Sequence, residues 1–267
     1  MEPNGVRVAT FNVHYLSQRV PAMNWDGRQE AVMRVIEAMN ADIIAFQEME
    51  TFAGGRFSDT NLQLDSVLAA FPEYAAAAVG DPEVYPSTQP ILYRPADLRV
   101  VTQGFFFFSE TPDTIYSRPW HKRFPAFASW ASFERLADGF EFTVFNVHTD
   151  ASSGRNRMKT ARLVVDRIEN RDDRGAPVIL AGDFNAPASF PSARIYDRAD
   201  LVRARGSSAT FHFNRGLHLF PAIDHIRVSG GLSVSQASVV RLSLDGIWPS
   251  DHYPVLAVAT PTDQSTN

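Results

Sequence analysis

The sequence predicts an α/β protein folded as a layered sandwich, and two observations predict this class. Short runs of β-branched and aromatic residues recur along the chain, and only a few segments between them have the apolar spacing of a helix. Polar residues close many of these runs, from Asn12 to His252. Because no internal repeat, low-complexity tract or linker divides the chain, we expect a single domain over residues 1–267.

The first part of the chain alternates strands with helices. Residues 6–15 alternate loosely between apolar and polar side chains and predict a strand, and residues 41–50 predict another that closes on Glu48. Between them, residues 27–40 have the apolar spacing of one helical face, and residues 61–71 repeat it. The two apolar stripes consist of Val32, Val35, Ile36 and Met39, and of Leu64, Val67, Leu68 and Phe71.

The rest of the chain is richer in strands. Four consecutive phenylalanines at 105–108 are typical of a core strand, and residues 155–171 predict an amphipathic helix whose basic residues form a solvated face. Residues 205–221 read as a plain hairpin, in preference to a second substrate-binding loop that would use His212, Arg215 and His218. Further strands are predicted at 89–95, at 127–136, at 140–150 with His148 near its end, from 178 onward, at 221–230 and at 250–260.

The strand that begins at Val178 ends in an unusual way. Its apolar run passes through Gly182 directly into Asp183 and Asn185, and Pro187 then prevents further pairing. Alone, an Asp-x-Asn sequence after a strand is more often a turn signal than a catalytic pair. However, strand residues two apart share a face, so this spacing lets a carboxylate and an amide reach the same point.

The composition limits the classes of function. With 267 residues, 45% of them apolar, the chain can bury a large core. Its 25 basic and 30 acidic residues give a net charge of −5, which disfavours sequence-independent binding along DNA but leaves a local basic patch open. Because there is no cysteine, disulfides, thiolate catalysis and thiolate-metal sites are excluded.

Targeting signals are not visible in the sequence. No stretch has the length of a membrane span, and we expect no transmembrane segment. No signal peptide precedes the strand that begins at Val6, so a cytoplasmic protein is the default expectation. A chain whose signal peptide had been removed would look the same.

Five polar residues at strand ends are hard oxygen donors, and they suggest a metal site. Three carboxylates and two amides in one cleft would repel one another without a cation, and such donors select Mg²⁺, Mn²⁺ or Ca²⁺ over zinc or copper. His148 and His252 add groups that exchange protons near neutral pH. The set suits metal-assisted hydrolysis of a phosphate ester. The five donors are Asn12, Glu48, Asp183, Asn185 and Asp251.

Six short motifs occur in a familiar order: TFNVHY, IIAFQE, FNVH, LAGDFNAP, IDHI and SDHYPV. Together they resemble the endonuclease/exonuclease/phosphatase superfamily, the fold of pancreatic deoxyribonuclease, over about residues 6–258. The resemblance implies a four-layer α/β/β/α sandwich of two packed mixed sheets with helices on the outer faces. It also implies that the active site lies on one rim, where strands from both halves end.

The resemblance further implies a Mg²⁺ or Mn²⁺ cofactor and a metal-activated water. Glu48 matches the main metal ligand of the family, and Asp251 lies close enough to contribute directly or through water. Asn12 matches the asparagine that supports metal and phosphate. These three residues are therefore the predicted metal site, and Asn12 is also a predicted substrate contact.

The same resemblance assigns the catalytic roles. Asp183 aligns the attacking water or binds a metal, and Asn185 donates to a phosphate oxygen. His252 matches the histidine that contacts the phosphate and exchanges a proton, and Asp224 matches the carboxylate that orients it. His148 matches the position that assists the leaving group.

The sequence departs from the family pattern at two places around the substrate. Nuclease-like members often carry a glutamate near the start of the ILYR strand, where this chain has Ser87, Thr88 and Gln89, so His148 is expected to lack that partner. Many bacterial members place an arginine where this chain has Ala126, and nearby residues 122 and 123 are the candidate substitutes. The metal chemistry is expected to be intact while the specificity differs.

For the substrate we expect a phosphorylated small molecule, cleaved by a phosphodiesterase or phosphatase. The loop 109–125 offers Arg118 and Trp120 as substrate contacts, although a solvated surface explains it equally well. One alternative is a structure-selective DNA or RNA endonuclease that uses the same site and a flanking basic groove. A less favoured alternative is a catalytically inactive binding scaffold, which would not need uncompensated carboxylates in one cleft.

Overall fold

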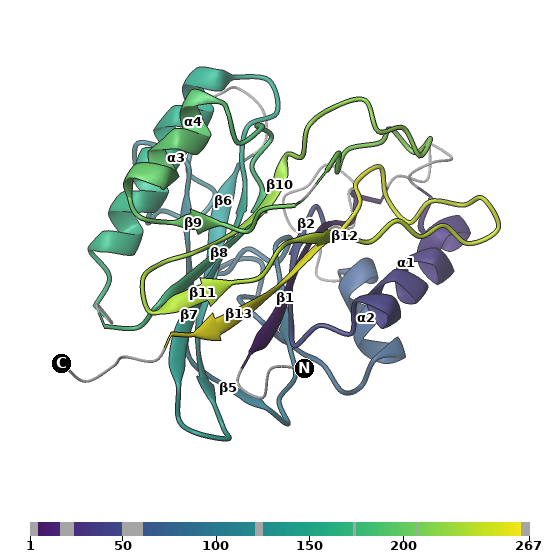
Figure 1. Cartoon of the computed structure of the whole chain (residues 1–267), viewed down its shortest axis with the longest axis horizontal. Helices are drawn as coiled ribbons and strands as arrows, with labels where there is room; N and C mark the ends of the chain where they lie inside the picture. The colour runs from purple at the N-terminus through teal and green to yellow at the C-terminus, as the bar shows by residue number, and fades with distance from the viewer. Residues whose placement is uncertain are drawn as a thin grey trace.

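Two β-sheets pack face to face, and a pair of helices covers the outer face of each sheet (Figure 1). The computed structural model describes residues 5–16, 24–49, 61–120, 125–172, 175–206 and 208–262. The predicted four-layer α/β/β/α sandwich is confirmed. In the described ranges, no helix has the length and apolar character needed to cross a membrane.

The first sheet is mixed and contains both ends of the described chain. Its strands follow the order β11-β13-β1-β2-β4-β3, and β12 pairs with β13. The strands are β1 (Val6–Asn12), β2 (Ile43–Gln47), β3 (Ala75–Ala77), β4 (Ile91–Tyr93), β11 (Leu232–Val234), β12 (Ser238–Val239) and β13 (Val255–Pro261). β1 runs parallel to β2, in a register that pairs Asn12 with Gln47, because the helix α1 (Trp25–Met39) connects them as a crossover.

The second sheet repeats this crossover. Its order is β5-β6-β7-β8-β10-β9, and β7 is parallel to β8 because the helix α3 (Gly154–Glu169) joins them. The register pairs His148 with Asp183, while the antiparallel β10 pairs Asp224 with Asp183. The strands are β5 (Leu98–Phe107), β6 (Phe127–Arg135), β7 (Glu141–His148), β8 (Val178–Asp183), β9 (Val202–Arg203) and β10 (Asp224–Val228).

The helices begin at side chains that satisfy their free amides. Asn24 caps α1, Asn61 caps α2 (Leu62–Ala70) and Ser153 caps α3, each by accepting a hydrogen bond from a backbone N–H of the first turn. A fourth helix, α4 (Pro191–Arg198), was not expected from the sequence; it begins with Pro191 and packs beside α3.

The apolar residues form three buried layers, as the four-layer arrangement requires. One lies between the sheets, one under α1 and α2, and one under α3 and α4. The core strand expected at the four phenylalanines is confirmed as the end of β5, where Phe106 and Phe107 are buried.

The hairpin expected at residues 205–221 is wrong. The described part of this segment contains no strand, and only an isolated bridge joins Phe211 to His252. Phe213 and Asn214 form a turn, but the residues before it pair with the chain around His252: the N–H of Tyr253 donates to the carbonyl oxygen of Thr210 at 2.7 Å, and the N–H of His212 donates to that of Asp251 at 2.8 Å. His212 is buried against the ring of Tyr253, so this histidine belongs to the packing of the segment.

Candidate active site

The polar ends of both crossover units meet at one edge of the sandwich. The parallel strands β1, β2, β7 and β8 end there with Asn12, Gln47, His148 and Asp183. Side chains from both sheets interact across this edge, because the Nδ2 atom of Asn12 lies 3.1 Å from Oδ2 of Asp183. Residues 171 positions apart in the sequence therefore form one site.

Asp183, Asp224 and His252 form its buried centre. Nδ1 of His252 lies 3.0 Å from Oδ2 of Asp224, and its Nε2 lies 3.8 Å from Oδ2 of Asp183. Burial opposes the charge on the imidazole, but the two carboxylates outweigh it and raise the pKa of His252 well above 6.5. The ring is therefore an imidazolium at neutral pH, with one N–H held by Asp224 and the other directed toward Asp183.

Asp183 is held by amides on both sides. Its Oδ1 accepts a hydrogen bond of 2.8 Å from the backbone N–H of Asn185, and its Oδ2 accepts from Asn12 at 3.1 Å and from Nδ2 of Asn185 at 3.4 Å. Burial, followed by the charge of Asp224, raises the pKa of the Asp183 carboxyl. Asp183 is thus a stronger base than a surface carboxylate.

The Asp-x-Asn pair converges as expected but by a different backbone path. Asn185 has a left-handed conformation, with φ of 45°, so the side chains meet through a turn and not through continued strand alternation. Nδ2 of Asn185 also donates to the carbonyl oxygen of Thr149 at 2.9 Å. The turn and this hydrogen bond hold the amide beside the carboxylate.

Glu48 stands opposite this centre, directly after β2. Its backbone is left-handed, with φ of 56°, and its carboxylate accepts from Asn12 at 3.2 Å and from the backbone N–H of Tyr15 at 3.3 Å. Burial opposes ionisation of Glu48, but His148, His14 and His252 outweigh it and lower the pKa of this carboxyl. Glu48 is therefore an anion at neutral pH.

The expectation that His148 lacks a carboxylate neighbour is wrong. Its Nε2 lies 3.6 Å from Oδ2 of Asp183 and 3.7 Å from Oε1 of Glu48. The absence of a glutamate near Gln89 is thus compensated by Asp183 from the neighbouring strand β8 and by Glu48 from the end of β2 in the other sheet.

Asp251 borders the site from the loop before β13. Its Oδ1 lies 3.3 Å from Nδ1 of His14, and its side chain is 19% exposed. Glu48 is similarly accessible, with a side chain that is 22% exposed. Both carboxylates lie near His14, and their oxygens can bind a hard cation that enters from solvent.

A second group of potential ligands is less suited to a metal. Asp183, Asp224 and His252 have ligand atoms within 4.8 Å of one another, and all three residues are buried. However, Nδ1 of His252 is already bonded to Asp224, so at most one nitrogen of this ring is left for a metal. The accessible carboxylates are the better metal donors.

A buried arginine holds the loops that carry these groups. Arg28 is 3% exposed and donates to the backbone carbonyl oxygens of Val13 and Pro249, and also to that of His14. It thereby ties the end of β1 to the loop of Asp251. The sequence could have indicated that Arg28 is buried, because it lies four residues before Val32 and therefore on the apolar face of α1.

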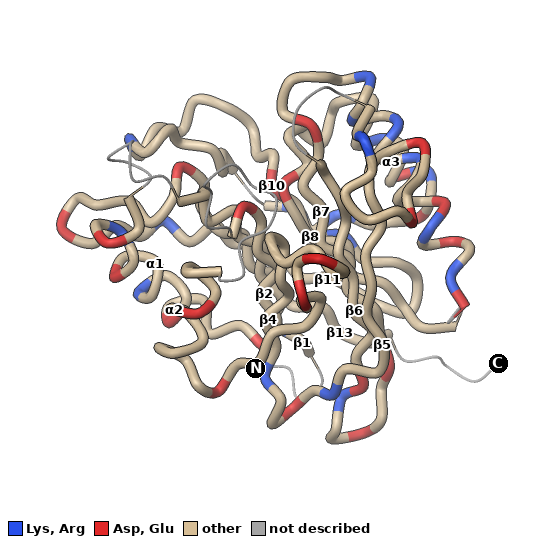
Figure 2. Tube along the Cα trace, turned by 180° about the vertical axis from the view of Figure 1, so that it is seen from behind, with Lys and Arg blue, Asp and Glu red and all other residues tan. Residues whose placement is uncertain are grey.

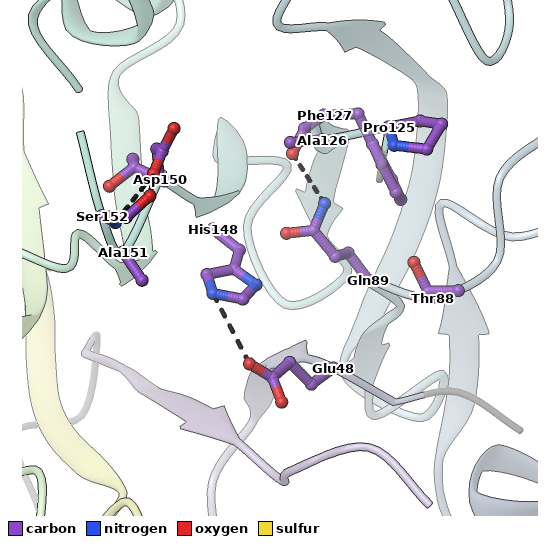
Figure 3. A pocket seen from close by; sticks show the side chains of 11 residues that line it. Glu48, Thr88, Gln89, Pro125, Ala126, Phe127, His148, Asp150, Ala151 and Ser152 are labelled. Carbon is purple, nitrogen blue, oxygen red and sulfur yellow. Dashed lines mark hydrogen bonds and ion pairs between the residues drawn. The ribbon is translucent and has the colours of Figure 1, made fainter. Parts of the chain in front are cut away.

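A pocket of about 240 Å³ opens beside His148 and Glu48 (Figure 3). Asp150 on its wall is already used, because its carboxylate accepts from Ser152, Ser153 and Asn156 at the start of α3. The other lining residues are Thr88, Gln89, Pro125, Ala126, Phe127, Thr149 and Ala151. Thr88, Gln89 and Ala126 are positions where the sequence departs from the family pattern.

Arg118 and Trp120 do not line this pocket. Arg118 is exposed, and Trp120 packs against the layer under α3, with Nζ of Lys159 5.1 Å from its ring centre. The candidate substitutes at 122 and 123 lie outside the described residues. The proposed contact of Arg118 and Trp120 with a substrate stays a prediction.

Buried amides join the two sheets directly behind the site. Nε2 of Gln47 donates to Oδ1 of Asn146 at 2.7 Å, and Nδ2 of Asn146 donates to the carbonyl oxygen of Phe46 at 2.7 Å. Both side chains are fully buried. Because Gln47 precedes Glu48 and Asn146 shares a strand face with His148, this pair fixes how far apart the two sheets hold those residues.

Gly182 allows β7 and β8 to approach at the site. Its φ is 152°, and a Cβ atom there would overlap the carbonyl oxygen of Val147 on the neighbouring strand. We expect Gly182→Ala to lower the free energy of unfolding by about 3 kcal/mol or more, measured by urea denaturation. Gly27→Ala is the control, because no atom lies within 4 Å of its Cβ position in α1 and it should be neutral or stabilising. Equal stability of the two variants would contradict this role.

Comparison with protein families and solved structures supports this description. The family model described as "Endonuclease/Exonuclease/phosphatase family" matches residues 9–252. A protein of that family from Bacteroides thetaiotaomicron is 25% identical, with a TM-score of 0.82, over 98% of this chain and 100% of the other.

Two further relatives differ in what is known of them. A Bacteroides thetaiotaomicron structure named mannosyl-6-phosphatase is 26% identical, with a TM-score of 0.80, over 96% of this chain and 99% of its own. The uncharacterized protein L388 of Acanthamoeba polyphaga mimivirus is 29% identical over 67% of each chain. The likeness to the two Bacteroides structures therefore extends over nearly the entire chain.

Proposed function

Because this chain belongs to the endonuclease/exonuclease/phosphatase family, whose members hydrolyse phosphate esters, we propose that it hydrolyses the phosphate ester of a small molecule with Mg²⁺ or Mn²⁺. The observation that carries the proposal is the meeting of Asp183, a carboxylate with a raised pKa, and the imidazole of His252, whose pKa is also raised. The side-chain amides of Asn12 and Asn185 join them, beside a pocket of about 240 Å³. Pockets for drug-sized ligands span about 300–1,000 Å³, so this one suits a small alcohol.

Asp183 and His252 divide the proton chemistry in this proposal. Asp183 accepts a proton from the attacking water, since its raised pKa makes it an effective base near neutral pH. His252 donates a hydrogen bond from Nε2 to a phosphoryl oxygen, and Asp224 stabilises its positive charge. The long 3.4 Å contact of Asn185 with Asp183 is the one that a phosphoryl oxygen replaces. His148, on the pocket wall, faces the leaving alcohol.

The accessible carboxylates fit a hard divalent cation. Glu48 is ionised and partly open to solvent, and Asp251 is similarly open on the other side of His14. These two residues would hold the ion, and Asn12, whose amide bridges Glu48 and Asp183, would support it. When bound, such a cation polarises a phosphoryl oxygen and offsets the negative charge of the transition state.

An endonuclease is the second candidate, but the distribution of charge favours the small molecule. Among the described lining residues of the pocket there is no lysine or arginine. Basic residues gather along α3 on the outside of the molecule (Figure 2), where Arg155 and Arg162 are exposed. The name of the mannosyl-6-phosphatase relative also supports a small substrate.

The proposal is tested with an aryl phosphate monoester, an aryl phosphodiester, an inositol phosphate and supercoiled plasmid, each with Mg²⁺, with Mn²⁺ and with chelator. We expect metal-dependent turnover of at least one small ester, no turnover in chelator and intact plasmid. Nicking of the plasmid that stops in chelator would favour the endonuclease instead. Turnover that persists in chelator would contradict the metal requirement.

A further inference from the structure

Among the described residues, only the NH₂ group of the Gln89 side-chain amide has a hydrogen-bond partner, and the oxygen has none. Gln89 is 4% exposed, and its Nε2 donates to the carbonyl oxygen of Phe127 at 2.6 Å. Its Oε1 is buried and has no hydrogen-bond partner among the described residues. Figure 3 shows this oxygen turned into the pocket, toward the side on which His148 lies. A buried acceptor without a donor is costly, so its place in a ligand pocket calls for an explanation.

The orientation of this amide is determined by its surroundings. The carbonyl of Phe127 can only accept a hydrogen bond, so the NH₂ group must face Phe127 and the oxygen must face the pocket. The backbone of Gln89 is held as well, because its carbonyl oxygen accepts from Oγ of Ser129 at 2.6 Å and from Nδ2 of Asn146 at 3.2 Å. Oε1 is therefore a fixed acceptor.

Two other polar side chains of the pocket wall are already engaged in hydrogen bonds within the protein. Asp150 accepts hydrogen bonds at the start of α3, and Oγ1 of Thr149 donates to the carbonyl oxygen of Phe184 at 2.5 Å. The remaining wall includes Pro125, Ala126 and Phe127, which present apolar surface. A ligand that fits must bring a hydrogen-bond donor to Gln89 and C–H groups to the apolar wall.

We propose that Oε1 of Gln89 accepts a hydrogen bond from a hydroxyl group of the leaving alcohol, and that the substrates are phosphate esters of sugars or other polyhydroxy alcohols. The inference rests on the proposed function. A sugar ring carries both hydroxyl donors and C–H faces, which matches the pocket. A site built to hydrogen-bond a hydroxyl rejects an analogue without it, because the acceptor is then left unpaired. Gln89 is thus a specificity-determining residue.

The test compares two esters of similar size, glucose 6-phosphate and cyclohexylmethyl phosphate, which lacks hydroxyl groups. The wild-type protein should have a kcat/KM at least about tenfold higher for the sugar ester. Gln89→Met, which removes the acceptor at similar volume, should lower this ratio about tenfold. Gln103→Met is the matched control, because Oε1 of Gln103 bonds the Ala78 amide away from the pocket.

Each other outcome has a defined meaning. An equal fall for both esters in Gln89→Met would show that the contact with Phe127 matters and would overturn the inference. A wild-type protein that turns over both esters equally would overturn it too, while the proposed function stands. If neither ester nor any small ester of the metal panel is hydrolysed, the proposed function fails first. Thermal unfolding of each variant verifies that it is folded.

Discussion

Asp183→Asn is expected to lower kcat/KM by about 10³-fold or more, because the variant cannot accept a proton from water. The fold should survive, but the free energy of unfolding at pH 7 should fall somewhat, because both carboxylate oxygens of Asp183 accept hydrogen bonds and the NH₂ group of an asparagine cannot. A carboxyl whose pKa is raised in the folded state holds its proton more tightly there than in the unfolded chain, so ionising it at neutral pH costs stability. Removing that cost offsets part of the loss.

Steady-state kinetics and urea denaturation together check this result. Asp97→Asn is the control, because Asp97 is exposed on the turn before β5 and far from the polar edge in sequence and register. Turnover within tenfold of the wild type in a folded Asp183→Asn protein would contradict the role of Asp183 as base. Loss of activity in a variant that no longer shows a cooperative urea transition would indicate a structural role instead.

Asp224→Asn should have the second largest effect, a loss of about 10³-fold in kcat/KM. Asp224 holds Nδ1 of His252 at 3.0 Å, and its charge is the main factor that raises the pKa of that imidazole. Without it, the ring loses both its orientation and much of its positive charge near neutral pH. NMR titration of the metal-free protein should show His252 releasing its proton at lower pH than in the wild type.

The same ion pair predicts how stability depends on pH. A histidine whose pKa is raised by folding contributes stability that is fully present below its unfolded pKa of about 6.5 and is lost as the pH rises through the folded pKa. The stability difference between wild type and Asp224→Asn should therefore be larger at pH 6 than at pH 9. A difference that grows with pH, or an unchanged titration of His252, would contradict the pairing.

The sequence predicted most of the long elements because their patterns are local. The helical stripe of α1 and the apolar run of β8 fall where they were expected, since burial of one face determines both. The short strands β3 and β9 were missed because three or two residues carry no periodicity. Segment 205–221 was misassigned because its alternation of apolar and polar residues resembles a strand, whereas its pairing with the chain around His252 is a long-range contact.

The candidate site was predictable to the extent that it follows strand ends. Asp183, Asp224 and His252 each follow or begin an apolar run, and the resemblance supplied their order. What the sequence could not indicate is the contact between sheets, such as that of His148 with Glu48. The free oxygen of Gln89 is similar, because it depends on which atom Phe127, 38 residues away, presents to the amide.

The amide pair of Gln47 and Asn146 has a consequence for how this site responds to a ligand. It joins the two sheets with hydrogen bonds that no water can replace, because both side chains are fully buried. Sliding one sheet against the other would break these bonds without compensation. The spacing between Glu48 and His148 is thus set when the chain folds. Ligand binding therefore needs little free energy to bring these two side chains into position.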